Sequence, residues 1–249
     1  MDRKQLAPLF DGWNVAMIGS YLHGYMGKGY ADNANPPVSG QIVVGDFCFY
    51  AGIPDLNLVR NIPLNFRSKY ILMVPRNDQW SAMIETCYGE RAKKIKRYAV
   101  KKEPYVFDCA KLQQFTERLP EGYTLSMMDE ALFRRTKQQD WSKDLTSQFP
   151  FYEQYRQYGI GTAVLYQNEL VAGASSYTVY RGGIEIEIDT HESHRRRGLA
   201  LACGAKLILS CLERGLYPSW DAHDMRSVAL CEKLGYHFDK EYVAYCVEV

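Results

Sequence analysis

The chain has 249 residues, of which 47% are hydrophobic and 24% are charged. This ordinary globular composition excludes the fibrous and disordered classes, and the length fits one large domain or two small ones. Thirty Lys and Arg residues stand against 29 Asp and Glu residues, for a formal charge of +1. The chain therefore has no general field that would attract nucleic acid or an anionic membrane.

No segment predicts membrane insertion or export. No apolar run reaches the roughly 18 residues that span a bilayer, and Arg3, Lys4 and Pro8 interrupt the start of the chain, where a signal peptide has its apolar core. We therefore expect a cytoplasmic protein. The seven cysteines are odd in number and widely spread, without a C-x-x-C pair. They predict reduced core thiols rather than a disulfide framework or a zinc site.

The first half of the chain predicts mixed α/β structure. Apolar runs indicate strands at 41–51 and 70–74, and helical spacing after Asn77 indicates a helix over 78–88. The glycine-rich cluster at 24–29 lacks the spacing of a nucleotide-binding P-loop. We interpret that cluster as a loop.

Seven Lys or Arg residues lie between Arg91 and Lys102, interleaved with apolar residues. The pattern favours a strand with one solvated face, because basic residues also protect edge strands from aggregation. A patch that binds phosphate or nucleic acid is the alternative, and the sequence leaves it open.

The second half predicts a regular order of strands and helices after a boundary at 119–122, which closes a helix at 110–119. The strands are expected at 123–127, 160–166, 170–179, 184–189, 217–222 and 238–247, and the helices at 129–138, 199–214 and 226–234. Residues 167–169 form a hairpin turn. The strand 184–189 alternates isoleucine with carboxylate, so one of its faces is apolar and the other is acidic.

The strongest functional signal is the turn Arg195-Arg196-Arg197-Gly198-Leu199-Ala200 at the start of an apolar helix. The first backbone N–H groups of a helix have no partner within it, and the helix dipole adds positive charge there. Gly198 lets a ligand approach the backbone, and the arginines can bind a diphosphate. An exposed basic turn without a ligand is the alternative.

These six residues match R/Q-x-x-G-x-G/A and, with the acidic strand and the helix around them, resemble motif A of the GNAT acyl-CoA N-acetyltransferase superfamily. Downstream, Asp224-x-x-Ser227-x-x-Leu230-Cys231-Glu232-Lys233-Leu234-Gly235-Tyr236 resembles the closing N-x-x-A/S-x-x-L-Y-x-K-x-G-F segment of that family. Residues 218–221 further resemble the subgroup typified by zwittermicin A resistance acetyltransferases. In that subgroup an additional α/β region precedes the GNAT core.

The resemblance implies a mixed α/β fold, with a GNAT acetyl-CoA-binding catalytic domain at 121–249 and an α/β region at 1–120 on the acceptor side. It implies transfer of acetyl from acetyl-CoA to a primary amine of a small, antibiotic-like molecule, without a metal. The implied cofactor-binding residues are Ile188, Asp189, Thr190, Arg195, Arg196, Arg197, Gly198, Leu199, Ala200, Asp224 and Ser227. The backbone at 188–190 would pair with the pantetheine arm. A membrane or nucleic-acid partner is not implied, and a homodimer is compatible with the resemblance.

The catalytic base is predicted from chemistry. A primary amine with a pKa near 10 is almost wholly protonated at neutral pH, so a group must accept its proton. Glu185 and Glu187 share one strand face, with β-carbons about 7 Å apart, and each opposes ionisation of the other. Such a carboxylate suits a general base that acts directly or through water. A solvated or ion-paired face is the alternative, and Asp189 on the same face is expected to be structural.

Two positions depart from the family pattern. Asp224 stands where many members have Asn, and Cys231 stands where many have the Tyr that protonates the leaving thiolate. A thiol at this helical position is more often part of the core, so the identity of the general acid stays open. Asp221 and His223 lie near the end of a predicted strand and are further candidates for substrate contact.

Two other classes of function remain open. The absence of the Tyr at Cys231 is compatible with a sensor that binds acyl-CoA without turnover, and the basic segment 91–102 is compatible with a tRNA- or nucleic-acid-linked transferase. Release of CoA on addition of an amine, binding without release, and a steep salt dependence of binding distinguish the three classes. His191 and His194 are expected to be exposed loop residues.

Overall fold

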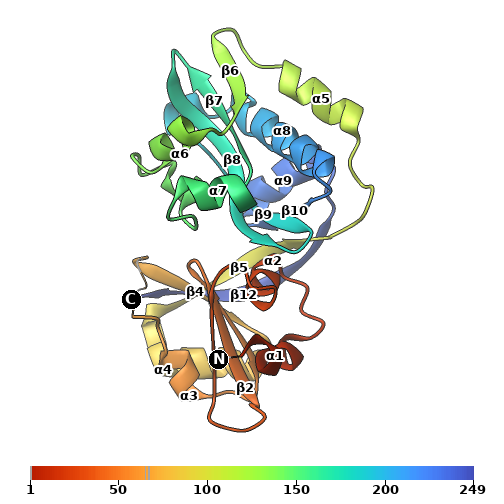
Figure 1. Cartoon of the computed structure of the whole chain (residues 1–249). Coiled ribbons are helices and arrows are strands. Elements are labelled where there is room, and N and C mark those ends of the chain that lie inside the picture. The colour runs from red at the N-terminus through yellow and green to blue at the C-terminus, as the bar shows by residue number, and fades with distance from the viewer. Residues whose placement is uncertain (1, 65, 67) are drawn as a thin grey trace. The chain divides into compact units, whose positions relative to one another are not determined.

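The computed structural model describes residues 2–64, 66 and 68–249 (Figure 1). The chain divides into two compact units. The first unit contains residues 1–97 together with 241–249, and the second unit contains residues 98–240. The second unit is thus an insertion in the sequence of the first. The proposed division into lobes at residue 120 concerns function and stays a prediction.

The first unit contains a mixed sheet in the order β1-β2-β3-β4-β12-β5. Its strands are β1 (Lys28–Ala31), β2 (Ser39–Val44), β3 (Phe47–Gly52), β4 (Tyr70–Pro75), β5 (Ala92–Val100) and β12 (Phe238–Glu248), and the last two also have residues in the second unit. Its helices are α1 (Arg3–Leu6), η1 (Ala7–Phe10), α2 (Ala16–Leu22), α3 (Leu56–Arg60), α4 (Asp78–Tyr88) and η2 (Gly89–Arg91). The predicted strand at 70–74 and helix at 78–88 are confirmed, and Asn77 accepts a hydrogen bond from Trp80 N at the start of α4.

The predicted single strand at 41–51 is wrong, because the segment forms two antiparallel strands, β2 and β3. Val44 lies opposite Phe47, and Gly45, with φ +61°, and Asp46 form the turn between them. A two-residue hairpin turn requires such a backbone, which glycine adopts at little cost. The Gly-Asp pair inside the apolar run was the signal for this turn.

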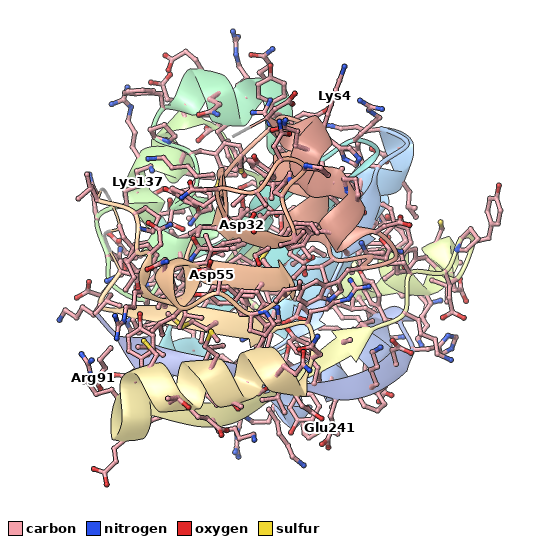
Figure 2. The ribbon with its side chains drawn as sticks, turned by 90° about the horizontal axis from the view of Figure 1, so that it is seen from below. Lys4, Asp32, Asp55, Arg91, Lys137 and Glu241 are labelled. Atoms are coloured by element: carbon pink, nitrogen blue, oxygen red, sulfur yellow. The ribbon has the colours of Figure 1, made fainter. Side chains whose placement is uncertain are left out.

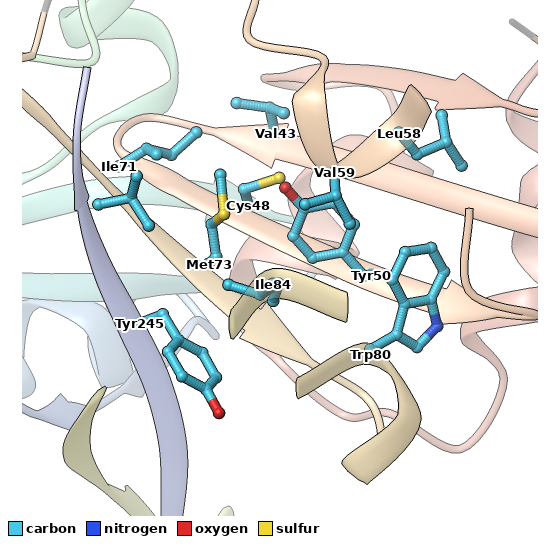
Figure 3. Packing of buried hydrophobic residues seen from close by; sticks show 11 residues of the cluster. Val43, Cys48, Tyr50, Leu58, Val59, Ile71, Met73, Trp80, Ile84 and Tyr245 are labelled. Carbon is cyan, nitrogen blue, oxygen red and sulfur yellow. The ribbon is translucent and has the colours of Figure 1, made fainter. Parts of the chain in front are cut away.

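The core of the first unit joins residues 43–84 with the end of the chain (Figure 3). The ring centroids of Tyr50 and Trp80 lie 5.1 Å apart in a stacked pair. The buried cluster consists of Val43, Cys48, Tyr50, Leu58, Val59, Ile71, Met73, Trp80, Ile84, Tyr245 and Val247. Because Tyr245 and Val247 belong to β12, the last strand of the chain completes this core.

A buried polar contact ties α3 to β2. Gln41 is fully buried, and its Nε2 donates to the carbonyl oxygens of Leu58 and Asn61 at 3.0 and 2.8 Å. Its Oε1 accepts from Asn61 Nδ2 at 2.6 Å. The side chain therefore satisfies polar groups that the apolar surroundings would otherwise leave without partners.

Replacing Gln41 by leucine is expected to lower the free energy of unfolding by about 1–3 kcal/mol, because the partners of the amide stay buried without hydrogen bonds. Urea denaturation measures the change. The matched control is Gln113→Leu on the exposed surface of α5 (Cys109–Glu117), expected to change stability by less than about 0.5 kcal/mol. Equal effects of the two substitutions would contradict the role assigned to Gln41.

The basic segment forms β5, and its predicted solvated face is confirmed. Its exposed lysines pair with glutamates: Lys93 with Glu248 at 3.3 Å, Lys94 with Glu85 at 3.2 Å and Lys96 with Glu241 at 2.7 Å. Glu241 and Arg91 mark this surface of the first unit in Figure 2. Arg97 differs from the prediction, because it is buried and lies over the ring of Phe47 at 4.9 Å. The paired glutamates reduce the positive charge that this strand presents to a phosphate.

The second unit has a five-stranded sheet in the order β10-β9-β8-β7-β6. Its strands are β6 (Tyr123–Met127), β7 (Gly161–Tyr166), β8 (Glu169–Tyr180), β9 (Gly183–Thr190) and β10 (Tyr217–Ser219), and its helices are α5, α6 (Glu130–Thr136), η3 (Lys143–Thr146), α7 (Tyr152–Tyr158), η4 (Glu192–His194), α8 (Leu199–Glu213) and α9 (Met225–Leu234). The pairs from β6 to β9 are antiparallel, and β9 and β10 are parallel. The predicted mixed α/β fold is confirmed.

The faces of the second sheet are covered by different helices, with α8 on one side and α6 and α7 on the other (Figure 1). On the first side, Thr162 Oγ1 donates to the Cys203 carbonyl of α8 at 2.9 Å, and Gly204 of α8 packs next to Ile188. On the other side, Tyr155 of α7 lies 2.8 Å from the hydroxyl of Ser175. The isoleucines of β9 therefore face α8, and its alternating carboxylates project on the side of α7.

The predicted strand 217–222 is interrupted and is wrong as a single element. Residues 217–219 form β10 beside β9, whereas Asp221–Ala222 form β11 and pair with Tyr98 and Ala99 of β5. Trp220, which is buried, lies between the two pieces. As a result, the paired part of β9 and β10 ends early, and in the described part of the chain no other strand continues the pairing of β9 on that side.

No helix in the described part of the chain has both the length and the apolar character needed to cross a bilayer.

Candidate functional site

The turn between β9 and α8 exposes the start of a long helix. Gly198 is the N-cap residue of the 15-residue helix α8 and has φ +80°, and Arg196 before it also has a positive φ of 62°. No side chain of the described residues caps this end of α8. A Cβ added at Gly198 would meet nothing within 4 Å. The first N–H groups of α8 are therefore open to an anion.

Arg195 fastens this turn to the end of β9. Its Nε donates to the Thr190 carbonyl at 3.1 Å, and its guanidinium lies 3.9 Å from Asp189 Oδ1. Asp189 also accepts from Thr190 N at 2.6 Å, and burial raises the pKa of Asp189 while these partners oppose the rise. Arg196 and Arg197 are exposed. The structure thus brings residues 188–190 and 195–200 together, as the sequence predicts.

Beyond this turn, β9 offers a backbone edge. Among the described residues, the ladder between β9 and β10 comprises three pairs and ends where Ser219 lies opposite Glu185. Residues 186–190 of β9 extend past it. The Thr190 hydroxyl is buried and has no hydrogen-bond partner in the described part of the chain. An exposed strand edge presents N–H and C=O groups that an extended ligand with amide groups can use.

The two predicted catalytic carboxylates lie in different surroundings. Glu185 is 5% exposed and lies opposite Thr178 of β8 and Ser219 of β10. Glu187 is half-buried and lies opposite Ser175. The interpretation of this strand face as merely solvated is therefore wrong for Glu185.

A lysine that the sequence reasoning did not assign to the site interacts with Glu185. Burial lowers the pKa of Lys102, and the negative charge of Glu185 opposes this effect. The sequence shows Lys102 only as the last residue of a basic run, and nothing local connects that run with β9. The alternative of an ion-paired carboxylate thus has a specific partner.

The family is decided by comparison with known proteins. A model of the GNAT acetyltransferase family matches residues 7–245. The chain belongs to the GNAT acetyltransferase family. The predicted superfamily, and the N-acetyltransferase class that it implies, are confirmed at this level, and enzymes of the family use acetyl-CoA.

Individual relatives agree with this assignment. A solved GCN5-related N-acetyltransferase-like protein from Streptococcus suis 89/1591 has 41% identity and a TM-score of 0.92, covering 98% of this chain and 97% of that one. The uncharacterized N-acetyltransferase YdfB of Bacillus subtilis is 28% identical over 72% of this chain and 66% of its own length. An acetyltransferase from the GNAT family of Colwellia psychrerythraea, at 12% identity and a TM-score of 0.54, covers 100% of this chain and 98% of that chain and shares the fold.

Two further residues predicted to bind the GNAT cofactor have contacts of their own at the start of α9. Asp224 is the N-cap residue and accepts from the backbone N–H groups of Arg226 and Ser227, both at 2.9 Å. Hydrogen bonds from the Arg226 guanidinium and from these groups lower the pKa of Asp224. Ser227 Oγ accepts from Trp220 Nε1 at 3.0 Å. These contacts explain why Asp and Ser occur at positions 224 and 227 even without a bound ligand. The role of both residues in cofactor binding therefore stays a prediction.

Cys231, at the position of the frequent GNAT tyrosine, is a core residue. It is fully buried in α9, where Sγ lies 3.1 Å from the Val228 carbonyl, and burial raises the pKa of Cys231 to about 12. Proton donation from such a thiol to a thiolate with an ordinary pKa near 8.5 would be uphill by about 3.5 pKa units, or about 5 kcal/mol. The thiol is therefore a poor general acid.

Replacing Cys231 by alanine is expected to lower turnover by less than about tenfold while destabilising the fold by about 1–2 kcal/mol through lost packing. CoA release and thermal unfolding measure the two effects. Cys211→Ala is the control, because Cys211 is also fully buried, and burial raises its pKa to about 12. A severe loss of turnover in the Cys231 variant alone would make this thiol a chemical group of the reaction.

The histidines just before the turn at 195–198 are half-buried and pack against aromatic rings, so the prediction that they are exposed is wrong. His194 Nδ1 lies 2.8 Å from the hydroxyl of Tyr123, and its ring contacts Tyr166. His191 packs edge-on against Trp141. Burial, and then the charges of Arg197 and His191, lower the pKa of His194. These contacts support the loop that leads into the turn.

The other candidate groups differ in exposure. His223 is exposed, and Asp221 is half-buried in β11. The seven cysteines are free thiols, four of them buried, whereas Cys109 is exposed and does not fit the predicted core position. Among the described residues, no group of three or more His, Cys, Asp or Glu is placed to hold a metal ion.

Proposed function

We propose that the chain transfers an acetyl group from acetyl-CoA to a primary amine of a small molecule, by direct attack in a ternary complex. The observation that carries this proposal is the open start of α8 at Gly198, with three arginines before it and an acidic strand leading into it. Family membership and this geometry support the same reaction. In this proposal acetyl-CoA is a co-substrate.

The turn fits the diphosphate of such a co-substrate. Gly198 has open space where a side chain would stand, and the N-terminal N–H groups of α8 point out of the helix. Arg196 and Arg197 supply exposed positive charge, and Arg195 holds the turn to Thr190. Leu199 is buried, so it contributes its backbone N–H alone. The arrangement combines hydrogen bonding with charge, as phosphate recognition requires.

The edge of β9 suits the amide-containing arm. Residues 188–190 extend past the end of β10, so an extended chain can hydrogen-bond there as an added strand. The buried Thr190 hydroxyl lies at the same end of the strand. The proposed path therefore runs from the turn along the edge of β9 toward Glu187 and Glu185.

A carboxylate of β9 accepts the proton of the amine in this proposal. Deprotonating an amine of pKa near 10 at neutral pH costs about 4 kcal/mol, and Glu185 or Glu187 provides the acceptor, directly or through water. Water protonates the leaving thiolate, because Cys231 is buried with a raised pKa. The bound amine then attacks the thioester carbonyl while the protein holds both partners in place.

The acceptor is proposed to be an amino-polyol or similar antibiotic-like amine, as in zwittermicin A resistance enzymes. This proposal is supported by the resemblance of residues 218–221, and of the additional α/β region at the start of the chain, to that subgroup. In this proposal the first 120 residues shape the acceptor pocket. The family as a whole accepts many amines, so the fold alone does not select one.

A screen of amine acceptors with release of free CoA thiol as the readout tests the proposal. Aminoglycosides and amino-polyols are expected to give release above the rate of hydrolysis. Calorimetric binding of acetyl-CoA without release for any amine would favour the acyl-CoA sensor instead. Tight binding of tRNA with a steep salt dependence would favour the nucleic-acid-linked transferase.

A further inference from the structure

A lysine from outside the GNAT motifs has an electrostatic interaction with the buried carboxylate of Glu185. Lys102 follows β5, is half-buried and belongs to the second unit, as Glu185 does. The two opposite charges interact. Lysine is rarely placed in the interior unless a partner compensates its charge. The pair therefore links a segment before the GNAT motifs with the strand that carries the proposed base.

Side chains of β8 and β10 hold Lys102 in place. Its Nζ lies 5.1 Å from the centre of the Tyr180 ring, and the Tyr180 hydroxyl lies 2.8 Å from Ser219 Oγ. Ser219 is the residue opposite Glu185 in the parallel ladder. The ammonium group, the ring and the carboxylate thus belong to one continuous cluster at the last paired position of β9 and β10.

The backbone on both sides of Lys102 is also fastened to β10. The Tyr217 hydroxyl accepts from Glu103 N at 3.0 Å and donates to the Lys101 carbonyl at 3.3 Å. Because Tyr217 lies opposite Gly183 in the ladder, the segment 101–103 is anchored at the start of β9. Lys102 therefore has a fixed place relative to Glu185.

The charges around Glu185 give Lys102 a clear electrostatic role. Burial disfavours an ionised carboxylate, and a cation nearby favours it. Among the described residues, Tyr180, Tyr217 and Tyr236 also have an electrostatic interaction with Glu185, and burial raises the pKa of each, to about 12 for Tyr180. These phenols are neutral at physiological pH. Glu187, two residues along β9, adds negative charge, and Lys102 supplies a compensating positive charge.

We propose that Lys102 is a positioning residue for the acetyl transfer, whose ammonium keeps the Glu185 carboxylate ionised and oriented to accept the amine proton. The inference rests on the proposed function and extends it to a residue outside the GNAT motifs. A base that is protonated at working pH cannot accept a proton. Lys102 thus offsets the effect of burial on the ionisation of Glu185, although it also makes the Glu185 carboxylate a weaker base.

The ionisation of Glu185 can be measured without any acceptor. Carbon NMR of the full chain with labelled glutamate follows the carboxyl as pH changes, with Glu185→Gln identifying the signal. Lys102→Met is expected to move the titration midpoint of Glu185 upward by about one pH unit, whereas Lys102→Arg leaves it nearly unchanged. Lys101→Met, at the exposed neighbouring lysine, is the matched control and is expected to have no effect.

Kinetics supply the second readout. With an acceptor from the amine screen, Lys102→Met is expected to lower kcat about tenfold at neutral pH and to move the acidic limb of kcat/KM upward, with an unchanged acetyl-CoA Kd. Higher pH restores the rate of this variant, and Lys102→Arg keeps it. A purely structural lysine would lower the melting temperature without moving the pH profile.

Two outcomes would overturn the inference: an unchanged Glu185 midpoint in folded Lys102→Met, or a midpoint above about pH 7 in the unaltered chain. Lys102→Gln, whose amide can still hydrogen-bond, replaces the methionine variant if that variant does not fold. Failure of the proposed function is seen separately, as absence of CoA release from the unaltered chain with every amine. In that case the NMR titration still decides whether Lys102 sets the ionisation of Glu185.

Discussion

Replacing the glutamate that acts as the base by glutamine is expected to lower turnover by about 100-fold or more, while the acetyl-CoA Kd stays nearly constant. Glutamine keeps the shape of the side chain but cannot accept the amine proton. Glu185→Gln and Glu187→Gln are measured separately, because only one carboxylate need be the base. Glu169→Gln, the same exchange at the exposed start of β8, is the control and is expected to keep turnover within about twofold.

The pH dependence gives an independent check of the base. The acidic limb of kcat/KM reports ionisation of the essential carboxylate or of the amine, so it should flatten or move in the variant that lacks the base. Near-normal turnover in both glutamine variants would remove the carboxylates from the mechanism. Together with a severe loss in Cys231→Ala, that result would assign the chemistry to the cysteine.

The elements around the site could be predicted from the sequence because their signals are local. The alternation of isoleucine and carboxylate predicts β9, and the apolar run from Leu199 predicts α8, each within a residue of its observed bounds. Gly198 at the junction has the positive φ for which glycine is suited. Strand period, helix period and turn chemistry agree here, so the turn at 195–198 follows from neighbouring residues alone.

The parts that could not be predicted depend on partners distant in the chain. Residues 217–222 have the composition of one strand, yet the choice between β9 and β5 as partner breaks them at Trp220. The electrostatic interaction of Lys102 with Glu185 joins segments on either side of β6, β7 and β8. Likewise, the sequence predicts β12 as the last strand of the GNAT domain, although Tyr245 and Val247 of this strand complete the core of the first unit. Periodicity reports that a strand exists and does not report its partner.

A Gly198→Asp substitution is expected to weaken acetyl-CoA binding at least tenfold, about 1.4 kcal/mol, while the chain stays folded. The carboxylate would stand at the start of α8 and compete with the diphosphate for the same N–H groups and arginines. The fold should persist because a Cβ at Gly198 meets nothing within 4 Å, and because aspartate tolerates a positive φ better than most residues. Calorimetry with acetyl-CoA measures the loss.

Two control variants separate charge from backbone strain at Gly198. Gly198→Ala introduces the same positive-φ strain without charge and is expected to cost less than about threefold in affinity, since the open space at this position excludes a clash. Gly182→Asp places the same carboxylate at a glycine with φ +84° that also has open space around it, in the turn before β9, and should leave binding unchanged. If Gly198→Asp is folded and binds acetyl-CoA as well as these controls do, the diphosphate does not lie at the start of α8. The proposed path of the pantetheine arm along β9 would then be wrong as well, because that path starts at the N-terminal end of α8.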